Sequence, residues 1–303
     1  MKDHAAAKKN SADSLFRLAN GIGLAMLGYI SLSGILSFVW DGWAANRGEL
    51  VQTAVSLARY AVSLLLPFAL AGWALREEIR PLPHPNLVKD RWFLPSALAA
   101  GFGVACLGNL LAWLMQLTAA REGVEILHAA VNTDLGWPAL AITFVGYSLL
   151  AALVEEVVFR GVVLRMLRPW GDLWAVWCSA VLFALCHASP LQFLPALLTG
   201  ALLGAFVVIT GGIGLSVVVH TCYNALAMTL NYLLEGRSSV LPVLVIWAVL
   251  ILVGAAALLR LYGSWIRARL TPPRSRKDFY CAPVLLAAAA FMLVRILYGI
   301  IKV

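Results

Sequence analysis

The sequence predicts an all-α membrane protein, a polytopic transmembrane helical bundle of about eight to nine spans. Two observations predict this fold class. Hydrophobic residues make up 62% of the 303-residue chain and charged residues only 13%, whereas a soluble protein carries about 25% charged residues. Apolar runs of about 18 or more residues also recur from end to end, and each is long enough to cross a bilayer core of roughly 30 Å. A β-barrel would instead show short segments of alternating polarity.

The apolar segments divide the chain into four regions. A basic leader, residues 1–18, is expected to lie in the cytoplasm, and N-terminal membrane spans follow within 19–136. Residues 137–234 hold the polar motifs, and residues 235–303 form the C-terminal spans. The first apolar run is longer than the roughly 7 to 15 residues of a signal peptide, so we expect it to be retained. The expected spans, of which the last also fits a half-buried hairpin, are 19–40, 53–75, 93–118, 137–167, 173–189, 191–209, 213–234, 240–262 and 281–301.

Positive charge predicts the orientation of these spans. With the N-terminus inside, 16 Lys and Arg residues fall in cytoplasmic connections and only 4 fall outside. Basic residues gather in the cytoplasmic loops of membrane proteins, so the N-terminus is expected in the cytoplasm. The same rule accounts for the net charge of +8 without any nucleic-acid partner. The expected surroundings are a lipid bilayer, and the Ala- and Leu-rich, Lys-poor composition favours a bacterial inner membrane.

Small residues are predicted to bring helices together rather than to take part in chemistry. The segment from Gly200 to Gly204 reads GALLG, a pattern that lets two helices approach closely. The five cysteines lie in or near apolar runs, and no two of them form a CxxC pair. They are therefore expected to pack between helices rather than to form a disulfide framework.

The fourth span contains three ionisable residues in an otherwise apolar run, LLAALVEEVVFRGVV. A charge near the membrane centre costs at least about 2.5 to 3.5 kcal/mol, so such residues are functional candidates. Glu156 and Arg160 lie one helical turn apart and are expected to form a salt bridge, which is more often structural than catalytic. Glu155 points about 100° away from Glu156 around the helix and has no cation in its own turn. Glu155 is therefore predicted as an unpaired carboxyl suited to general acid–base catalysis.

Two later spans contribute further candidates, because FALCHASP places Phe183 one turn before His187 and HTCYN places His220 and Asn224 one turn apart. Either histidine alone fits a hydrogen bond between packed helices as well as it fits a ligand. The fourth and fifth spans look like a hairpin turning at RPWGD, with Glu155 and His187 each about 20 Å from the turn. His220 and Asn224 lie about 12 and 18 Å into their own span. The four residues are thus expected to converge in one intramembrane pocket.

These residues resemble the motifs of the CPBP family, which includes prenyl-protein (CAAX) endopeptidases and bacteriocin-processing and immunity proteins. The resemblance covers about residues 137–230 and leaves spans one to three and eight to nine outside it. Where relatives often read like TGSLWAPILAH this chain reads TGGIGLSVVVH, so the entrance to the pocket is expected to differ. The family order of EExxxR, FxxxH and HxxxN, each on its own apolar span, matches Glu155, Glu156, Arg160, Phe183, His187, His220 and Asn224.

The resemblance implies a glutamate-dependent intramembrane endopeptidase. By that likeness Glu155 is the general base that activates water, and His187 helps to bind and orient this water. His220 and Asn224 would stabilise the oxyanion of the tetrahedral intermediate, with donors placed where charge develops. The supporting residues of the site would be Glu156, Arg160 and Phe183.

A zinc site is the alternative chemistry. Glu155, His187 and His220 would supply three ligands and leave an open position for water. The family has often been labelled as metalloproteases for this reason. The chain lacks an HExxH motif, and Asn224 is a poor zinc ligand but a good oxyanion donor. The metal-free mechanism, without a cofactor, is therefore favoured.

The expected substrate is a membrane-anchored protein or peptide, such as a prenylated C-terminus, a bacteriocin leader or a C-terminal sorting tag. Prenylated substrates are unexpected in a bacterium, which favours a sorting tag or a processed peptide. The rival function is a non-catalytic membrane partner, such as a bacteriocin-immunity or regulatory protein. A third hypothesis is a proton-coupled transporter that uses Glu155 and His187 as a relay. The lack of an internal repeat counts against it.

Overall fold

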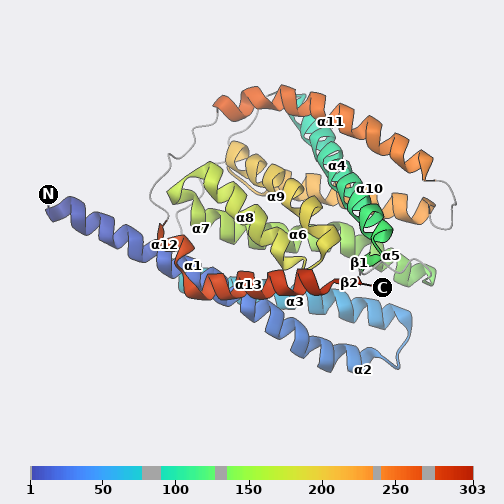
Figure 1. Ribbon diagram of the computed structural model, residues 1–303, viewed down its shortest axis with the longest axis horizontal. Coiled ribbons are helices and arrows are strands. Elements are labelled where there is room, and N and C mark those ends of the chain that lie inside the picture. Colours follow the sequence, from blue (N-terminus) through green and yellow to red (C-terminus); the bar gives the residue numbers. More distant parts are fainter. Residues whose placement is uncertain (1, 77–89, 127–134, 235–239, 268–276, 303) are drawn as a thin grey trace.

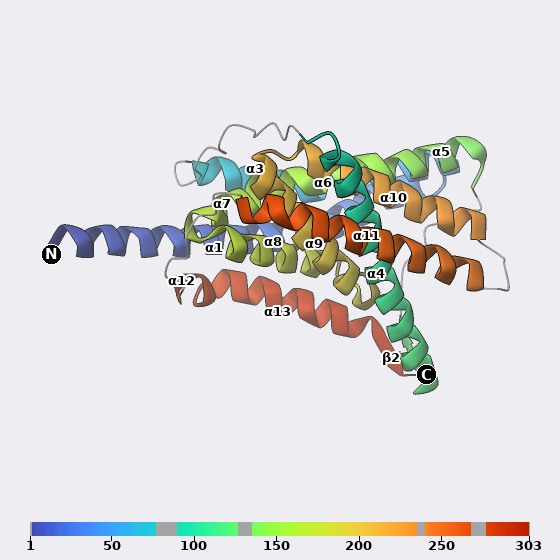
Figure 2. The same cartoon turned by 90° about the horizontal axis from the view of Figure 1, so that it is seen from above.

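The computed structural model describes residues 2–76, 90–126, 135–234, 240–267 and 277–302. Helices account for nearly all of this part of the chain, and Figure 1 shows them gathered in a bundle. The amino-terminal part of α1 projects from one end of this bundle, and the chain ends near the opposite end (Figure 1, Figure 2). One short antiparallel pair, β1 (Val124–Ile126) and β2 (Ile300–Lys302), connects the end of α4 with the end of α13. The expected all-α class is confirmed, with this small strand pair as an addition.

The expected apolar segments coincide with helices, but not all of these helices have the length of a span. Within the described ranges, six helices are long and apolar enough to cross a membrane, whereas the apolar stretches of α8, α10 and α13 are shorter. The count of eight to nine spans is therefore not confirmed. Helix α1 begins at Lys2, so it includes most of the predicted leader as well as the first apolar run. The main helices are α1 (Lys2–Leu36), α3 (Glu49–Ala74), α4 (Phe93–Arg121), α8 (Asp172–Cys186), α9 (Pro190–Thr210), α10 (Gly214–Leu234), α11 (Leu241–Arg267) and α13 (Pro283–Tyr298), with the shorter η1 (Ser37–Asp41), α2 (Gly42–Ala44) and α12 (Lys277–Tyr280) between them.

The helix that carries the two glutamates is wound unevenly. Its residues, 137–170, include two π-helical segments, and such segments are rare and frequent at functional sites. Glu155 and Glu156 lie in the short α-helical stretch between them. The chain then reverses at Gly171, whose φ of 128° favours glycine, so the predicted turn at RPWGD is confirmed. The successive pieces are α5 (Trp137–Val145), η3 (Gly146–Leu150), α6 (Ala151–Glu156), η4 (Val157–Leu164), α7 (Arg165–Leu167) and η5 (Arg168–Trp170).

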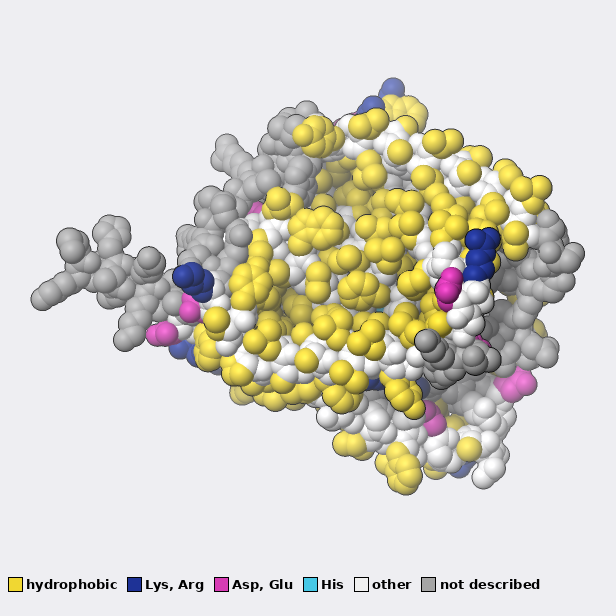
Figure 3. All heavy atoms as spheres, viewed as in Figure 1, with side chains coloured by type: hydrophobic (Ala, Val, Ile, Leu, Met, Phe, Trp, Pro, Cys, Tyr) yellow, Lys and Arg dark blue, Asp and Glu magenta, His cyan; other side chains and the backbone are white. Residues whose placement is uncertain are grey.

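The outer surface of the bundle is apolar, as a membrane protein requires. Large hydrophobic residues are exposed along the outer faces of the helices, for example Leu259 with 79% and Val294 with 62% of the residue surface exposed. Hydrophobic side chains cover most of the face in Figure 3, and the charged side chains lie toward its edges. Such an extensive apolar surface marks contact with lipid rather than water. The protein is therefore a multi-pass membrane protein.

The interior contains two hydrophobic cores that share α9. The larger core packs α1, α3, η4, α8 and α13 together, and the smaller core packs α4, α10 and α11. On α9, Val207 belongs to the larger core and the neighbouring Phe206 to the smaller one. Because α9 is buried from both sides, it fixes the position of α8 relative to α10, and these two helices bring the histidines to the site.

Glycine allows the closest helix contacts. A Cβ atom on Gly200 would lie 3.1 Å from the Phe183 ring, so the predicted close approach at GALLG is confirmed for α8 and α9. A second close contact joins α4 and α11, where a Cβ atom on Gly103 would lie 2.7 Å from the Cα atom of Gly254. All five cysteines are free thiols, as expected.

Candidate active site

A cavity of about 500 Å³ opens inside the bundle, bordered by α1, α3, α4, α6, α8, α9 and α10. Its lining includes all four residues predicted as catalytic. Glu155 comes from α6, His187 from the residue after α8, and His220 and Asn224 from α10. The structure therefore brings the four residues to one cavity, while their roles in catalysis remain predictions.

Glu155 is not the unpaired carboxyl that its own helix suggests. The hydroxyl of Tyr60, on α3, donates a hydrogen bond to Glu155 Oε1. Glu155 Oε2 lies 3.4 Å from His220 Nε2. The prediction of an unpaired carboxyl was wrong because both partners come from other helices, which the residue spacing on one helix does not reveal. Only 8% of Glu155 is exposed, and that part faces the cavity.

Glu156 and Arg160 form the predicted salt bridge at the centre of the bundle. Arg160 Nη1 lies 2.8 Å from Glu156 Oε1, and both side chains are fully buried. Arg160 Nη2 donates a hydrogen bond of 3.0 Å to the carbonyl oxygen of Gly200 on α9. The lack of a side chain at Gly200 leaves this carbonyl within reach. The pair therefore holds the helix that carries Glu155 and Glu156 against α9.

His220 links the two glutamates. Its Nδ1 lies 2.9 Å from Glu156 Oε1, and its Nε2 faces Glu155 from the other side of the ring. The ring also stacks on Tyr223, with ring centroids 4.8 Å apart and an interplanar angle of 20°. These contacts fix both the position and the tilt of the imidazole, so that one edge is held by Glu156 and the other edge is presented to the cavity.

Phe183 packs at the centre of this charged group. The guanidinium carbon of Arg160 lies 4.6 Å from the Phe183 ring centroid, an arrangement in which a cation meets the ring face. The same ring meets the His187 ring edge to face, with centroids 4.6 Å apart and an angle of 85°. The supporting role predicted for Phe183 therefore has a structural basis in contacts with both Arg160 and His187.

His187 follows the last residue of α8, where the chain turns toward α9. Its Nδ1 lies 2.9 Å from the carbonyl oxygen of Phe183. Because a carbonyl oxygen only accepts hydrogen bonds, Nδ1 carries the proton and Nε2 is an acceptor. Within the described part of the chain no residue bonds to this Nε2. The next residue, Ala188, has a φ of 49°, a left-handed conformation that reverses the chain beside the site.

Asn224 lies one turn after His220 on the same face of α10. Its side-chain amide donates a 3.2 Å hydrogen bond to the carbonyl oxygen of Tyr147 in η3. An amide nitrogen carries two hydrogens, so a second donor remains for another acceptor. Asn224 thus connects α10 to the helix of the glutamates and still presents a donor to the cavity.

The side chains do not form a metal site as they are arranged. Among the described residues, no three His, Cys, Asp or Glu side chains are grouped closely enough to hold a metal ion. Glu155 and His220 face each other, but His187 does not join them as a third ligand. Glu155, His187 and His220, the three ligands of the zinc alternative, thus line one cavity without forming such a group in the described part of the chain.

Three parts of the site escaped prediction from the sequence. Tyr60 reaches Glu155 from α3, Tyr223 supports the His220 ring, and the Gly200 carbonyl accepts from Arg160. Tyr223 lies between His220 and Asn224 in the sequence, so its position beside a motif was a usable signal. Tyr60 gave only the weak signal of a hydroxyl group in an apolar span.

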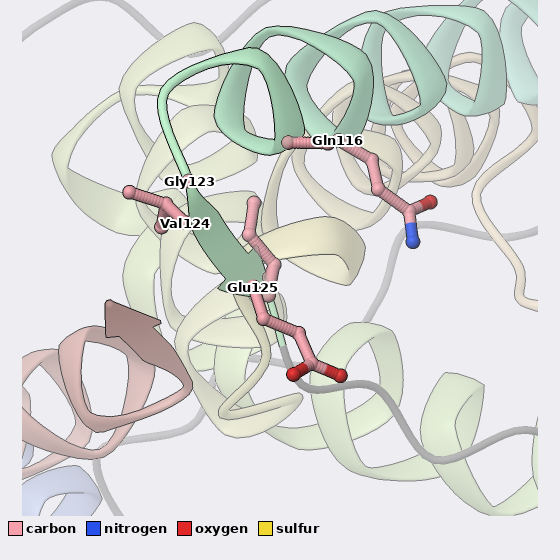
Figure 4. A pocket seen from close by; sticks show the side chains of 6 residues that line it. Gln116, Gly123, Val124 and Glu125 are labelled. Carbon is pink, nitrogen blue, oxygen red and sulfur yellow. The ribbon is translucent and has the colours of Figure 1, made fainter. Parts of the chain in front are cut away.

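A second pocket, of about 390 Å³, lies at the end of α4 beside β1 (Figure 4). Its polar side chains are Gln116 and Glu125, whose polar ends do not meet in Figure 4. It contains no histidine and no residue of the three motifs. The cavity around Glu155 is therefore the candidate active site.

Comparison with known proteins finds a family that resembles part of this chain. Residues 137–226 match the family described as type II CAAX prenyl endopeptidase Rce1-like. The match covers under a third of the 303-residue chain, but it contains all seven motif residues from Glu155 to Asn224. No curated protein and no solved structure matches the chain. Residues 137–226 are therefore similar to the Rce1-like type II CAAX prenyl endopeptidases, which belong to the CPBP family.

Proposed function

We propose that this protein is an intramembrane endopeptidase in which Glu155 activates a water molecule to hydrolyse a peptide bond. The observation that carries the proposal is the position of the Glu155 carboxylate, at a cavity shared with His187, His220 and Asn224. A nearly buried carboxylate inside an apolar bundle is costly, which is why such groups mark functional sites. The Rce1-like character of residues 137–226 supports the same class of reaction.

In the proposed reaction, Glu155 removes a proton from water while the water oxygen attacks the carbonyl carbon of the peptide bond. His187 Nε2 accepts a hydrogen bond from this water and orients it. The carbonyl oxygen becomes negatively charged, and N–H groups of His220 and Asn224 stabilise it. Glu155 then passes its proton to the amide nitrogen. The C–N bond breaks, and a carboxylic acid and an amine are released.

Glu156 holds a proton on the ring of His220, as the role of oxyanion donor requires. The Glu156 carboxylate only accepts hydrogen bonds, so the His220 Nδ1 beside it carries a proton. A second proton on Nε2 would give an imidazolium that donates toward the oxyanion. The positive charges of His220 and Arg160 would then balance the two glutamates, and a buried cluster without net charge is much less costly than an unbalanced one.

We propose that the substrate is a membrane-anchored protein or peptide cleaved in or near its anchor. The cavity lies between helices whose outer faces are apolar, which suits a substrate delivered by the bilayer. CAAX-type cleavage is the reaction named for the family. The composition of the chain favours a bacterial inner membrane with a cytoplasmic N-terminus, where a leader peptide or C-terminal sorting tag is the preferred substrate.

Cells that carry Glu155→Gln in place of the wild-type protein are expected to accumulate full-length forms of one or a few membrane proteins. The substitution keeps the shape of the side chain and removes the group that accepts the proton from water. The measurement is a comparison of protein termini in the membrane proteome, after cells lacking the protein are complemented with either version. The proteins that only the wild type shortens are the substrates.

The same comparison separates the enzyme from a non-catalytic partner. If both versions restore the phenotype and no terminus changes, Glu155 belongs to a binding or structural site. A matched control is Glu125→Gln, which changes a glutamate at the pocket of Figure 4, outside the cavity of Glu155. This control is expected to process the same substrates as the wild type.

We propose further that the reaction needs no metal ion, because Asn224 at the cavity is a poor zinc ligand but a good oxyanion donor. Purified protein treated exhaustively with a zinc chelator is therefore expected to keep its activity on a substrate found in the proteome. Activity that disappears on chelation and returns with added zinc would show that a metal takes part.

A further inference from the structure

The amino-terminal half of the chain contributes a residue to the site. Tyr60 lies on α3, outside residues 137–226 that match the family, and 95 positions before Glu155 in the sequence. Its hydroxyl lines the cavity and donates a hydrogen bond to Glu155 Oε1. The family resemblance therefore gives no account of this contact, which depends on how α3 packs against α6.

The two oxygens of Glu155 have different neighbours. Tyr60 holds Oε1 from α3, and His220 Nε2 lies 3.4 Å from Oε2 on the side of α10. A hydrogen bond from a neutral hydroxyl to a carboxylate is among the stronger hydrogen bonds in a protein interior. With Oε1 fixed in this way, rotation of the carboxylate is restricted, and the remaining lone pairs keep a constant direction toward the cavity.

The other groups near Glu155 do not replace Tyr60. Other groups that line the cavity with Glu155 are Tyr29 on α1, Cys186 on α8 and Tyr223 on α10. No hydrogen bond joins any of these three to Glu155 in the described structure. Tyr29 also lines the cavity, so it has the same side chain in the same cavity without the contact.

We propose that Tyr60 is a positioning residue that orients the Glu155 carboxylate for proton transfer. The inference rests on the proposed function of Glu155. It assigns to α3 a direct part in the site rather than a purely structural role. It also implies that the region 137–234 does not form a complete site without the amino-terminal helices.

The test compares Tyr60→Phe with Tyr29→Phe, two substitutions that each remove one hydroxyl and keep the ring. The substrate is a membrane protein that the wild type shortens in cells. Tyr60→Phe is expected to lower kcat by about 10- to 100-fold, as loss of a hydrogen bond to a charged group predicts. KM is expected to stay unchanged, because Tyr60 acts on the base rather than on substrate binding. Tyr29→Phe leaves the hydrogen bond from Tyr60 to Glu155 in place, so it is expected to keep the pH dependence of kcat of the wild type.

The pH profile distinguishes positioning from a structural effect. Because Tyr60 bonds to the group that accepts the proton, the pH dependence of kcat in Tyr60→Phe is expected to differ from that of the wild type. A Tyr60→Phe protein that is as active as the wild type, with the same profile, would overturn the inference. So would a fall in kcat with an unchanged profile and a lowered unfolding temperature, which indicates structural damage.

A second measurement needs no substrate and separates the two proposals. Infrared difference spectra between the wild type and Glu155→Gln are expected to isolate the carboxyl stretching band of Glu155. Loss of the Tyr60 hydrogen bond is expected to shift the frequency of this band in Tyr60→Phe, and in Tyr29→Phe the band is expected not to move. An unchanged frequency in Tyr60→Phe refutes the role of Tyr60, whatever proteolysis shows. A shifted frequency in Tyr60→Phe, together with a wild type that cleaves nothing, refutes the proposed function instead.

Discussion

Replacing Arg160 with methionine is expected to lower the free energy of unfolding by about 3 to 5 kcal/mol, the cost of leaving a buried charge without its partner. Arg160 and Glu156 are both fully buried, and their ion pair has a separation of 2.8 Å. Methionine fills much of the same space but offers no donor to Glu156 or to the Gly200 carbonyl. The loss is therefore electrostatic rather than a loss of volume. The free energy of unfolding is measured by denaturant titration of the purified protein in detergent.

The double variant Glu156→Gln with Arg160→Met is the matched control. Removing both charges eliminates the unpaired glutamate, so the double variant is expected to be more stable than Arg160→Met alone. Glutamine retains a carbonyl oxygen that still accepts from His220 Nδ1. If the double variant is instead less stable than Arg160→Met, the buried charge is not the source of the instability.

Replacing His220 with alanine is expected to reduce kcat by about 10²- to 10³-fold, the usual effect of losing one oxyanion donor. The structure makes this residue central, because its two ring nitrogens face Glu156 and Glu155. KM is expected to change little, since the oxyanion exists only in the transition state and the intermediate. The measurement is the turnover of a substrate found in the proteome, with purified variant and wild type in the same detergent.

Asn224→Ala tests the second proposed donor to the oxyanion in the same assay. It is expected to lower kcat in the same range, because both side chains are proposed to bind one oxygen atom. The Asn224 side chain is less buried than His220, so its removal disturbs packing less. If His220→Ala lowers only the unfolding temperature and leaves kcat intact, His220 is a structural link between the glutamates rather than a donor to the oxyanion.

Much of the site could be read from spacing along single helices. The interval of four residues predicted the salt bridge between Glu156 and Arg160, even though this stretch winds as a π helix. Equal distances from the turn at Gly171 predicted that Glu155 and His187 reach one cavity. These predictions succeed because helical rise and period are set by the backbone itself and depend little on the neighbouring helices.

Boundaries and lengths were less predictable. One helix, α1, continues from the predicted leader into the first apolar run, and the apolar stretches of α8, α10 and α13 are shorter than a full span. A hydropathy pattern shows where apolar side chains occur, but it does not show where the backbone leaves the helix. The end of α8 at Cys186, for example, is followed by the left-handed turn at Ala188.

The sequence by itself determined the class of the protein, the glutamate–arginine pair and the residues that meet at one cavity. Only the tertiary structure decided that Tyr60 bonds to Glu155, that His220 lies between two glutamates, and that Arg160 reaches the Gly200 carbonyl. The physical reason lies in the uniform apolarity of the spans. A helix that is apolar on all sides has no polar face to indicate which side is buried. Which neighbouring helix packs against it depends on how small and large side chains fit together.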